Sequence, residues 1–273
     1  MSECTHNCST CGSKCSEADN RAALNAFSHI KKVIAVTSGK GGVGKSSVTS
    51  MLAVLMARRG YKVGVLDADI TGPSIPKAFG ITRHAQANEM GLLPEETHMQ
   101  IRVMSINLLL ESEDQPVVWR GPVLGGAVTQ FWTDVVWGDL DVLFIDMPPG
   151  TGDVPLTVFQ SLPVDGAVVV TTPQSLVQMV VGKSVKMLEL LHVPVLGLVE
   201  NMSHVICPDC GKSIALFGDP DAAKKAAEAM DVPLLAQLPM DAEVARLCDA
   251  GEIERVVCEA LEPAADAVEV MLK

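Results

Sequence analysis

The stretch KVIAVTSGKGGVGKSSVTS, residues 32–50, decides the fold, because a short apolar run leads through a glycine-rich loop into a helix-length segment. The loop fits the pattern G-x-x-x-x-G-K-[S/T], whose glycines let the backbone wrap phosphate groups at a helix N-terminus. In this pattern Lys45 contacts the β- and γ-phosphates, and Ser46 offers its hydroxyl to Mg²⁺. The sequence therefore predicts a nucleotide site along Gly39, Lys40, Gly41, Gly42, Val43, Gly44, Lys45, Ser46 and Ser47.

Further short apolar runs follow the first one, separated by segments of helix length or more. Runs that are apolar on both faces are typical of buried parallel strands, and their alternation with helices predicts an α/β fold with a doubly wound, mostly parallel β-sheet. The helix expected after the loop ends in basic residues and Gly60. The other expected strands lie within residues 61–69, 101–106, 141–148, 166–173, 195–201 and 233–239.

The chain changes in composition near its N-terminus. Residues 1–28 hold four cysteines and few apolar side chains, so we expect a short cysteine-rich extension before a P-loop NTPase domain at residues 29–273. Within that domain, residues 83–100 carry the weakest pattern and are expected to form a loop or a mobile region.

Composition also bears on the cellular compartment. Hydrophobic residues make up 48% of the chain, yet no uninterrupted run of about 18 apolar residues predicts a membrane-spanning helix. The N-terminus is polar and lacks the apolar core of a signal peptide, which predicts a cytoplasmic protein. Thiols stay reduced there, so the eight cysteines are expected to be metal ligands or core residues rather than disulfides.

The net charge of −12 narrows the choice of partners. Nucleic acid is bound by clustered Lys and Arg, so an acidic balance argues against it. In residues 241–273 nine acidic residues stand against three basic ones, the reverse of the basic amphipathic helix that binds a membrane surface. We therefore expect neither a nucleic-acid partner nor a membrane partner.

Carboxylates stand where the expected strands end. Asp67 and Asp69 close one run, and Asp146 closes another, with Gly150 and Asp153 soon after it. Ligands bind at the carboxyl ends of strands in doubly wound sheets, and an acid there can join the Mg²⁺ shell or orient an attacking water. Each acid could instead cap a helix. Three of them beside a phosphate loop favour the catalytic interpretation.

A second lysine lies inside the loop, at position 40. The loop pattern does not require it, so two interpretations of Lys40 stay open. In one it is a solvated loop lysine. In the other its charge reaches the phosphates of a neighbouring subunit, as an arginine finger does in trans.

The stretch VICPDCGKS, residues 205–213, places Cys207 and Cys210 at Cys-x-x-Cys spacing. Two thiolates are half of a metal site, because such sites use four ligands. Cys248 and Cys258 have no partner at ligand spacing and are interpreted as core or surface thiols. Four N-terminal thiols could hold a [4Fe–4S] cluster or Zn²⁺, with His6 as a substitute ligand, or stay unligated; they are Cys4, Cys8, Cys11 and Cys15.

Several stretches together resemble the Mrp/Nbp35/ApbC group of P-loop ATPases, within the deviant-Walker-A class that includes MinD, ParA and the nitrogenase iron protein. The phosphate loop alone indicates the class, and the combination with WRGP, DMPPGTGD and CPDCG is specific to the group. The resemblance covers about residues 30–240. The stretches are SGKGGVGKSS (38–47), DADITGPSIP (67–76), WRGP (119–122), WGDLDVLFIDMPPGTGD (137–153), ENMS (200–203) and CPDCG (207–211).

The resemblance implies a homodimer that encloses two ATP molecules. Lys40 matches the signature lysine that contacts the nucleotide of the partner subunit. Asp69 matches the acid that positions the attacking water. Asp146 and Gly150 match the second switch, which senses the γ-phosphate.

The resemblance also implies where the base and the metal bind. Asn201 matches the residue that reads the adenine edge, and Met240 lies in the stretch that covers the base. Cys207 and Cys210 match paired cysteines that bind one [4Fe–4S] cluster between two subunits. Nbp35 relatives also carry four N-terminal cysteines, but their spacing is wider than the C-x3-C-x2-C-x3-C found here, so those roles are not carried over.

Taken together, the sequence predicts an ATP-binding carrier that passes iron–sulfur clusters to apo-proteins, with slow ATP hydrolysis as its switch. Two alternatives remain. A positioning ATPase like MinD or ParA would need a basic membrane- or DNA-binding surface. An ATPase with a structural zinc site would pair Cys207 and Cys210 with two N-terminal cysteines of the same chain.

Overall fold

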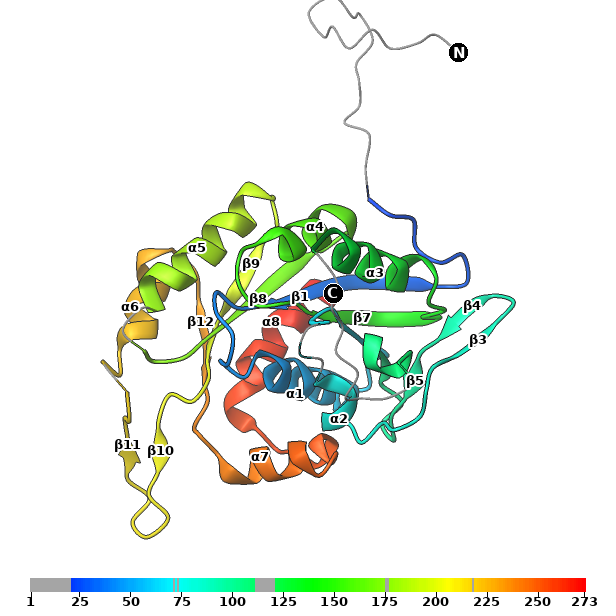
Figure 1. Ribbon diagram of the computed structural model, residues 1–273. Helices are drawn as coiled ribbons and strands as arrows, with labels where there is room; N and C mark the ends of the chain where they lie inside the picture. Colours follow the sequence, from blue (N-terminus) through cyan, green and yellow to red (C-terminus); the bar gives the residue numbers. More distant parts are fainter. Residues whose placement is uncertain (1–20, 71, 73, 111–120, 175–176, 218) are drawn as a thin grey trace, which may run out of the picture.

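The computed structural model describes residues 21–273 except residues 71, 73, 111–120, 175–176 and 218 (Figure 1). Eight strands form one central sheet: β1 (His29–Thr37), β2 (Val63–Asp67), β5 (Glu95–Glu96), β6 (Arg102–Met104), β7 (Asp139–Asp146), β8 (Gly166–Thr171), β9 (Val195–Glu200) and β12 (Leu234–Gln237). Their order across the sheet is β12-β9-β8-β1-β7-β2-β6-β5. Neighbouring strands are parallel, apart from the antiparallel edge pair β5 and β6.

Helices cover both faces of this sheet, which confirms the predicted doubly wound α/β fold (Figure 1). One face carries α1 (Lys45–Arg58), α2 (Ile75–Ala78), α7 (Ala242–Asp249) and α8 (Glu262–Leu272). The opposite face carries α3 (Gly121–Thr133), α4 (Asp153–Ser161), α5 (Val177–Leu190) and α6 (Ala222–Ala229). Short 3-10 turns lie at η1 (Ile106–Leu108), η2 (Ile253–Arg255) and η3 (Glu259–Leu261).

The central strand β1 is buried on both of its faces. Ile34 and Val36 pack into the core with α1 and α8, whereas Val33 and Ala35 pack into the core with α3, α4 and α5. A strand that is covered twice needs no alternation of polar and apolar residues, which explains its continuous apolar run. From β1 the chain continues to β2 and β6 on one side of the sheet, and later to β8, β9 and β12 on the other side. The carboxyl end of β1 therefore lies at the switch point, where doubly wound sheets bind ligands.

Both ends of α1 are fixed by glycine. Gly44 precedes the helix with a φ of 77°, a left-handed conformation that glycine adopts without a Cβ clash. At the other end Gly60 has a φ of 86°, and its N–H donates to the Ala57 carbonyl at 2.9 Å. The Tyr61 N–H donates to the Met56 carbonyl at 3.2 Å. These two bonds form a Schellman motif, which confirms the predicted helix end.

The expectation of a loop or mobile region at residues 83–100 is wrong in part. Residues within it form a hairpin of β3 (Gln86–Asn88) and β4 (Gly91–Leu93), and β5 follows. The Asn88 Oδ1 closes the turn by accepting the N–H groups of Met90 at 2.8 Å and Gly91 at 3.2 Å. These strands have at most three residues each, with exposed or half-buried side chains, so they lack the apolar run that marked the other strands.

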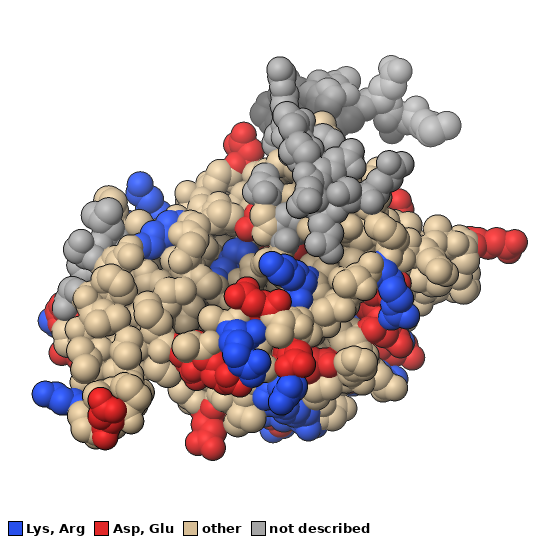
Figure 2. Space-filling model, turned by 60° about the horizontal axis from the view of Figure 1, so that its bottom comes forward, with Lys and Arg blue, Asp and Glu red and all other residues tan. Residues whose placement is uncertain are grey.

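A second hairpin, β10 (Val205–Ile206) and β11 (Ser213–Ile214), extends away from the sheet below β9 and β12 (Figure 1). Among the described residues no helix is long and apolar enough to cross a membrane. On the face shown in Figure 2, the described Lys and Arg side chains lie among Asp and Glu side chains rather than in a field of one sign.

Candidate functional site

The phosphate loop joins the carboxyl end of β1 to the N-terminus of α1. Gly42 and Gly44 both have φ near +77°, at 76° and 77°, so the loop turns through conformations that favour glycine. A cavity of about 250 Å³ lies over the loop, lined by residues 41–47 together with Asp69, Ser74 and Pro149. The unpaired N–H groups of a helix N-terminus favour anions, so this cavity has the backbone chemistry of a phosphate site.

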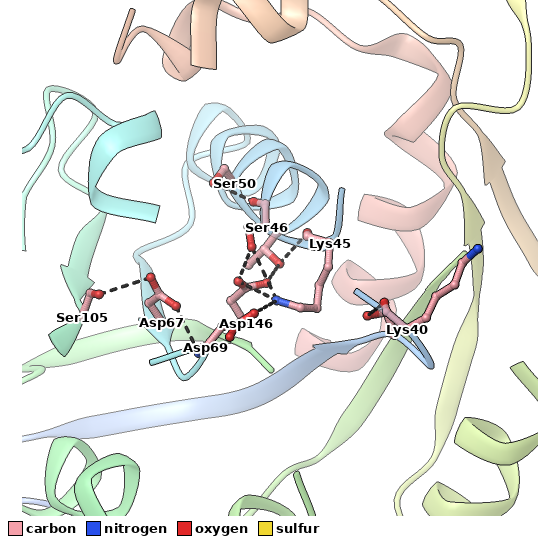
Figure 3. A network of polar contacts seen from close by, with 10 residues as sticks. Lys40, Lys45, Ser46, Ser50, Asp67, Asp69, Ser105 and Asp146 are labelled. Atoms are coloured by element: carbon pink, nitrogen blue, oxygen red, sulfur yellow. Dashed lines mark hydrogen bonds and ion pairs between the residues drawn. The ribbon is translucent and has the colours of Figure 1, made fainter. Parts of the chain in front are cut away.

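Lys45 extends from the first turn of α1 toward the acids at the ends of β2 and β7 (Figure 3). Its Nζ lies 2.8 Å from Asp146 Oδ2 and 3.7 Å from Asp69 Oδ2. The side chains of Lys45 and Asp146 are 6% and 0% exposed, so their attraction is weakly screened by water. A triphosphate entering the cavity would compete with these carboxylates for the same ammonium group.

Two hydroxyl groups of α1 donate to the carboxylate of Asp146. Ser46 Oγ lies 2.6 Å from Oδ2, and Thr49 Oγ1 lies 2.7 Å from Oδ1. The donors beside the cavity are thus hydroxyl and carboxylate oxygens, the ligands that Mg²⁺ prefers in proteins. The residues present fit a Mg²⁺ ion held by Ser46 and Asp146. Sequence reasoning missed Thr49, although it stands one helical turn after Lys45 on the same face of α1.

Asp67, like Asp146, is shielded from water. It is fully buried, and it accepts hydrogen bonds from Ser105 Oγ at 3.2 Å and from the Asp69 N–H at 3.2 Å. Burial, and then the nearby charge of Asp146, raise the pKa of Asp67 from 3.8 to about 8. Without a divalent cation this carboxyl is therefore stable in its neutral form near pH 7. Ser105 carried no sequence signal.

This raised pKa makes the stability of the nucleotide-free protein depend on pH. The folded state keeps a proton on Asp67 up to a pKa of about 8, whereas the unfolded chain releases it near 3.8, so folding binds a proton between these values. With a chelator present, the free energy of unfolding should fall by about 1 kcal/mol per pH unit from this group between about pH 6 and pH 8. Asp67→Asn should flatten that slope in urea unfolding at several pH values. Equal slopes in variant and wild type would contradict the assignment.

The loop after β7 lies against the phosphate loop. The Gly150 N–H donates to the Ser38 carbonyl at 2.8 Å, and Gly150 has a φ of 89°. A Cβ on Gly41 would come within 3.8 Å of the Pro149 ring. Asp153, in contrast, is the exposed first residue of α4, whose N-cap is Gly152, so Asp153 does not cap the helix. The structure thus brings Gly150 to the site and leaves Asp153 at its edge.

Lys40 points away from the cluster of Lys45 and the aspartates (Figure 3). Its Nζ donates to the side-chain oxygen of Gln174, in the loop after β8 of the same chain. Lys40 is partly exposed, and this bond lies within its own chain. Nothing in the sequence indicated Gln174 as its partner.

Asn201 lies directly against the phosphate loop. Its Nδ2 donates to the Val43 carbonyl at 3.0 Å, and its side-chain oxygen accepts the Met202 N–H at 3.0 Å. Met240 follows β12, with its side chain 40% exposed and its N–H donating to the His204 carbonyl at 2.7 Å. β9 and β12 are parallel, so Asn201 and Met240 lie at the same edge of the sheet as the phosphate loop.

Cys207 and Cys210 lie in the turn between β10 and β11. The Cys207 N–H donates to the Lys212 carbonyl, and the Gly211 N–H donates to the Cys207 carbonyl, each at 2.9 Å. Gly211 closes the turn with a φ of 70°. The backbone N–H of Cys210, that of Asp209 and the Cys210 thiol all direct hydrogen bonds at the Cys207 sulfur and lower the pKa of this thiol. These hydrogen bonds stabilise the thiolate of Cys207, and the thiolate is the metal-binding form of cysteine.

The described part of the chain contains no group of three or more His, Cys, Asp or Glu side chains that could hold a metal ion. Cys248 and Cys258 are half-buried, and burial raises the pKa of each thiol, which agrees with their interpretation as packing residues. Outside the described residues lie the four N-terminal cysteines (Cys4, Cys8, Cys11 and Cys15) and the first half of WRGP.

A family model described as ParA, NUBPL iron-transfer P-loop NTPase, matches residues 29–273. A Clostridium perfringens protein described as an iron-sulfur cluster carrier protein is 42% identical over 271 residues, covering 92% of this chain and 95% of the relative.

Two solved structures share the fold. A nucleotide-binding protein in complex with ADP, from Archaeoglobus fulgidus, is 43% identical with a TM-score of 0.77, covering 85% of this chain and 91% of that chain. The cell-division ATPase MinD of Pyrococcus furiosus has a TM-score of 0.60 at 20% identity, covering 88% of this chain and 99% of that one. At that identity the likeness to MinD concerns the fold alone.

Proposed function

Because the chain belongs to the NUBPL iron-transfer P-loop NTPase family, we propose that it is an ATP-binding carrier that holds an iron–sulfur cluster and passes it to apo-proteins. One observation carries this proposal. The same chain has a phosphate loop with a buried Lys45–Asp146 ion pair and, six residues beyond the Asn201 that touches this loop, a two-thiol turn that lowers the pKa of the Cys207 thiol.

The cluster is the cargo, and we assign it to two copies of the turn. Each chain supplies Cys207 and Cys210, and no third ligand stands near them among the described residues. A two-fold axis through two facing turns would bring four thiolates together, the ligand set of a [4Fe–4S] cluster. The hairpin and the residues directly after it also expose apolar side chains that an interface would bury: Ile206, Ile214, Leu216 and Phe217, each 39–51% exposed.

On the nucleotide side, the phosphate loop would bind ATP, with Lys45 leaving the carboxylates to contact the β- and γ-phosphates. Ser46 and Asp146 would hold Mg²⁺, which neutralises charge that develops on the phosphate oxygens. Asp69 lines the cavity, in a place suited to orienting the attacking water. Lys40 would reach the nucleotide of the partner subunit after releasing Gln174.

ATP would act as a switch rather than as a source of rapid turnover. The Gly150 N–H is bonded to the Ser38 carbonyl of the phosphate loop, so a γ-phosphate that binds this N–H would change the contact between the two loops. A ligand shifts an equilibrium by as much as its affinities for the two states differ. We assign the two states to dimers that hold and that release the cluster, with slow hydrolysis returning one to the other.

The proposal is tested by purifying the full chain without oxygen and measuring visible absorbance, iron and sulfide for each oligomeric state. We expect a brown dimer with about four irons in addition to any N-terminal cluster. A variant in which Cys4, Cys8, Cys11 and Cys15 are replaced measures how much iron the N-terminal cysteines bind. A colourless protein with one zinc per monomer would contradict it and favour the structural-zinc alternative. Binding to liposomes or DNA at physiological salt would favour a positioning ATPase.

A further inference from the structure

Residues 201–204 connect the phosphate loop to the cysteine hairpin, and they begin in close contact with the loop. Besides the bond from Asn201 Nδ2 to Val43, the Asn201 N–H donates to the Thr171 carbonyl at 2.8 Å. Asn201 is 9% exposed, and a Cβ on Gly44 would lie only 2.2 Å from its amide nitrogen. A movement of the loop backbone must therefore displace Asn201, because close-packed atoms leave no room to absorb it.

The other end of this segment is tied to the chain that follows β12. The Ser203 N–H and Ser203 Oγ both donate to the Leu238 carbonyl, at 2.9 and 2.8 Å. The Leu238 N–H donates to the Glu200 carbonyl at 2.8 Å, and the Met240 N–H to the His204 carbonyl at 2.7 Å. Ser203 is 6% exposed and Leu238 is 2% exposed. Hydrogen bonds shielded from water in this way hold two segments in one register.

The Ser203 hydroxyl lies at the centre of these contacts. It is 2.7 Å from His204 Nδ1 as well as 2.8 Å from the Leu238 carbonyl. Because a hydroxyl has one proton, it serves both partners when His204 Nδ1 carries its own proton and donates it to Ser203. β10 begins one residue after His204, so this side-chain network fixes the base of the hairpin that carries Cys207.

We propose that Ser203 is a positioning residue that couples the nucleotide site to the cysteine hairpin. The inference rests on the proposed function, since it assigns regulation to the same two sites. The Asn201 amide is bonded to the Val43 carbonyl of the phosphate loop, so a shift of this loop on nucleotide binding moves the start of residues 201–204. Ser203 passes that change to His204 and the hairpin, because it locks the segment to Leu238.

Coupling of this kind is reciprocal. If a cluster at Cys207 and Cys210 alters nucleotide affinity by some factor, nucleotide alters cluster affinity by the same factor. We expect a factor on the order of tenfold in the wild type, within the range of typical allosteric couplings. Without the Ser203 hydroxyl, the Leu238 carbonyl and His204 each lose a partner, and the factor should fall to about twofold or less.

The test uses the full chain, reconstituted with iron and sulfide without oxygen, and a non-hydrolysable ATP analogue as the probe. The dissociation constant of the analogue is measured with and without cluster for wild type, Ser203→Ala and Ser203→Thr. Ser28→Ala is the matched control, because Ser28 Oγ also links two backbone segments, accepting the Trp137 N–H at 2.8 Å, but at the opposite end of the sheet. Hydrogen exchange of the Cys207 amide, with and without analogue, provides a second readout on unmodified protein.

We expect Ser203→Ala to bind both ligands with its coupling factor lost, and Ser203→Thr and Ser28→Ala to keep the wild-type factor. Analogue binding should also change exchange at Cys207 in the wild type. An unchanged factor in Ser203→Ala would overturn the role of Ser203, as would a wild type that binds both ligands independently. A wild type that binds no cluster would instead overturn the proposed function, and the coupling with it.

Discussion

Replacing Lys45 with alanine should abolish ATP hydrolysis and weaken ATP binding on the order of 100-fold, the loss expected for a charge-assisted contact to phosphate. The ammonium group lies 2.8 Å from Asp146 and 3.7 Å from Asp69, at the start of α1 and 6% exposed. Without it, the cavity presents two carboxylates to the phosphates with no cation between them. Titration with a fluorescent nucleotide and a phosphate-release assay measure the two effects.

The fold should survive this change, because Ser46 and Thr49 still donate to Asp146. Thermal unfolding checks this point, and Lys45→Met provides a variant that keeps the bulk of the side chain. Lys31→Ala is the matched control, since Lys31 also pairs with an aspartate, Asp141 at 2.5 Å, but is 57% exposed and lies at the other end of the sheet. A Lys45→Ala protein that hydrolyses ATP at the wild-type rate would contradict the nucleotide assignment.

The variant Lys40→Ala distinguishes the role of Lys40 in ATP turnover from that of Lys45. If Lys40 acts on the nucleotide of the partner subunit, its removal should leave the affinity of the monomer for ATP nearly unchanged and lower turnover in the dimer, by on the order of 10³-fold as for a finger acting in trans. If it is a local loop lysine bonded to Gln174, turnover should not depend on it.

The fold was predictable because its signals are local. Each central strand is covered on both faces, so its apolar run is continuous, and the phosphate loop has a fixed spacing of glycines and lysine. The meeting of Asp67 and Asp146 was also predictable. Carboxyl ends of parallel strands share one edge, and the register of β2 and β7 places these two residues side by side.

Contacts that depend on register between distant segments were not predictable. Ser105 reaches Asp67 because β6 pairs with β2 so that Met104 lies beside Leu66, and no feature of the sequence specifies that pairing. The bond between Lys40 and Gln174 spans 134 residues and likewise has no local signal. The β3–β4 hairpin was missed for a different reason, because it is stabilised by the turn at Asn88 rather than by an apolar face.

The largest effect on the cargo should come from the cysteine turn. Replacing Cys207 and Cys210 together with alanine should remove the bridging cluster entirely, a loss of about four irons per dimer. The effect should be complete because the proposed site takes all four ligands from these thiolates, and no group of three or more metal-binding side chains stands among the described residues. Nucleotide affinity of the cluster-free protein should stay within about twofold, since the change leaves the phosphate loop intact.

The matched control is Cys248→Ala with Cys258→Ala, which removes two thiols that are half-buried and whose pKa is raised rather than lowered. That variant should keep its cluster, because a thiol that resists ionisation is a poor metal ligand. Iron and sulfide analysis and the visible spectrum of both variants are compared with the protein in which the N-terminal cysteines are replaced. The contrary result is a protein with Cys207→Ala and Cys210→Ala that retains its iron, while the N-terminal variant loses it. That result would assign the cluster to the N-terminal extension, and the hairpin would then have no role in cluster binding.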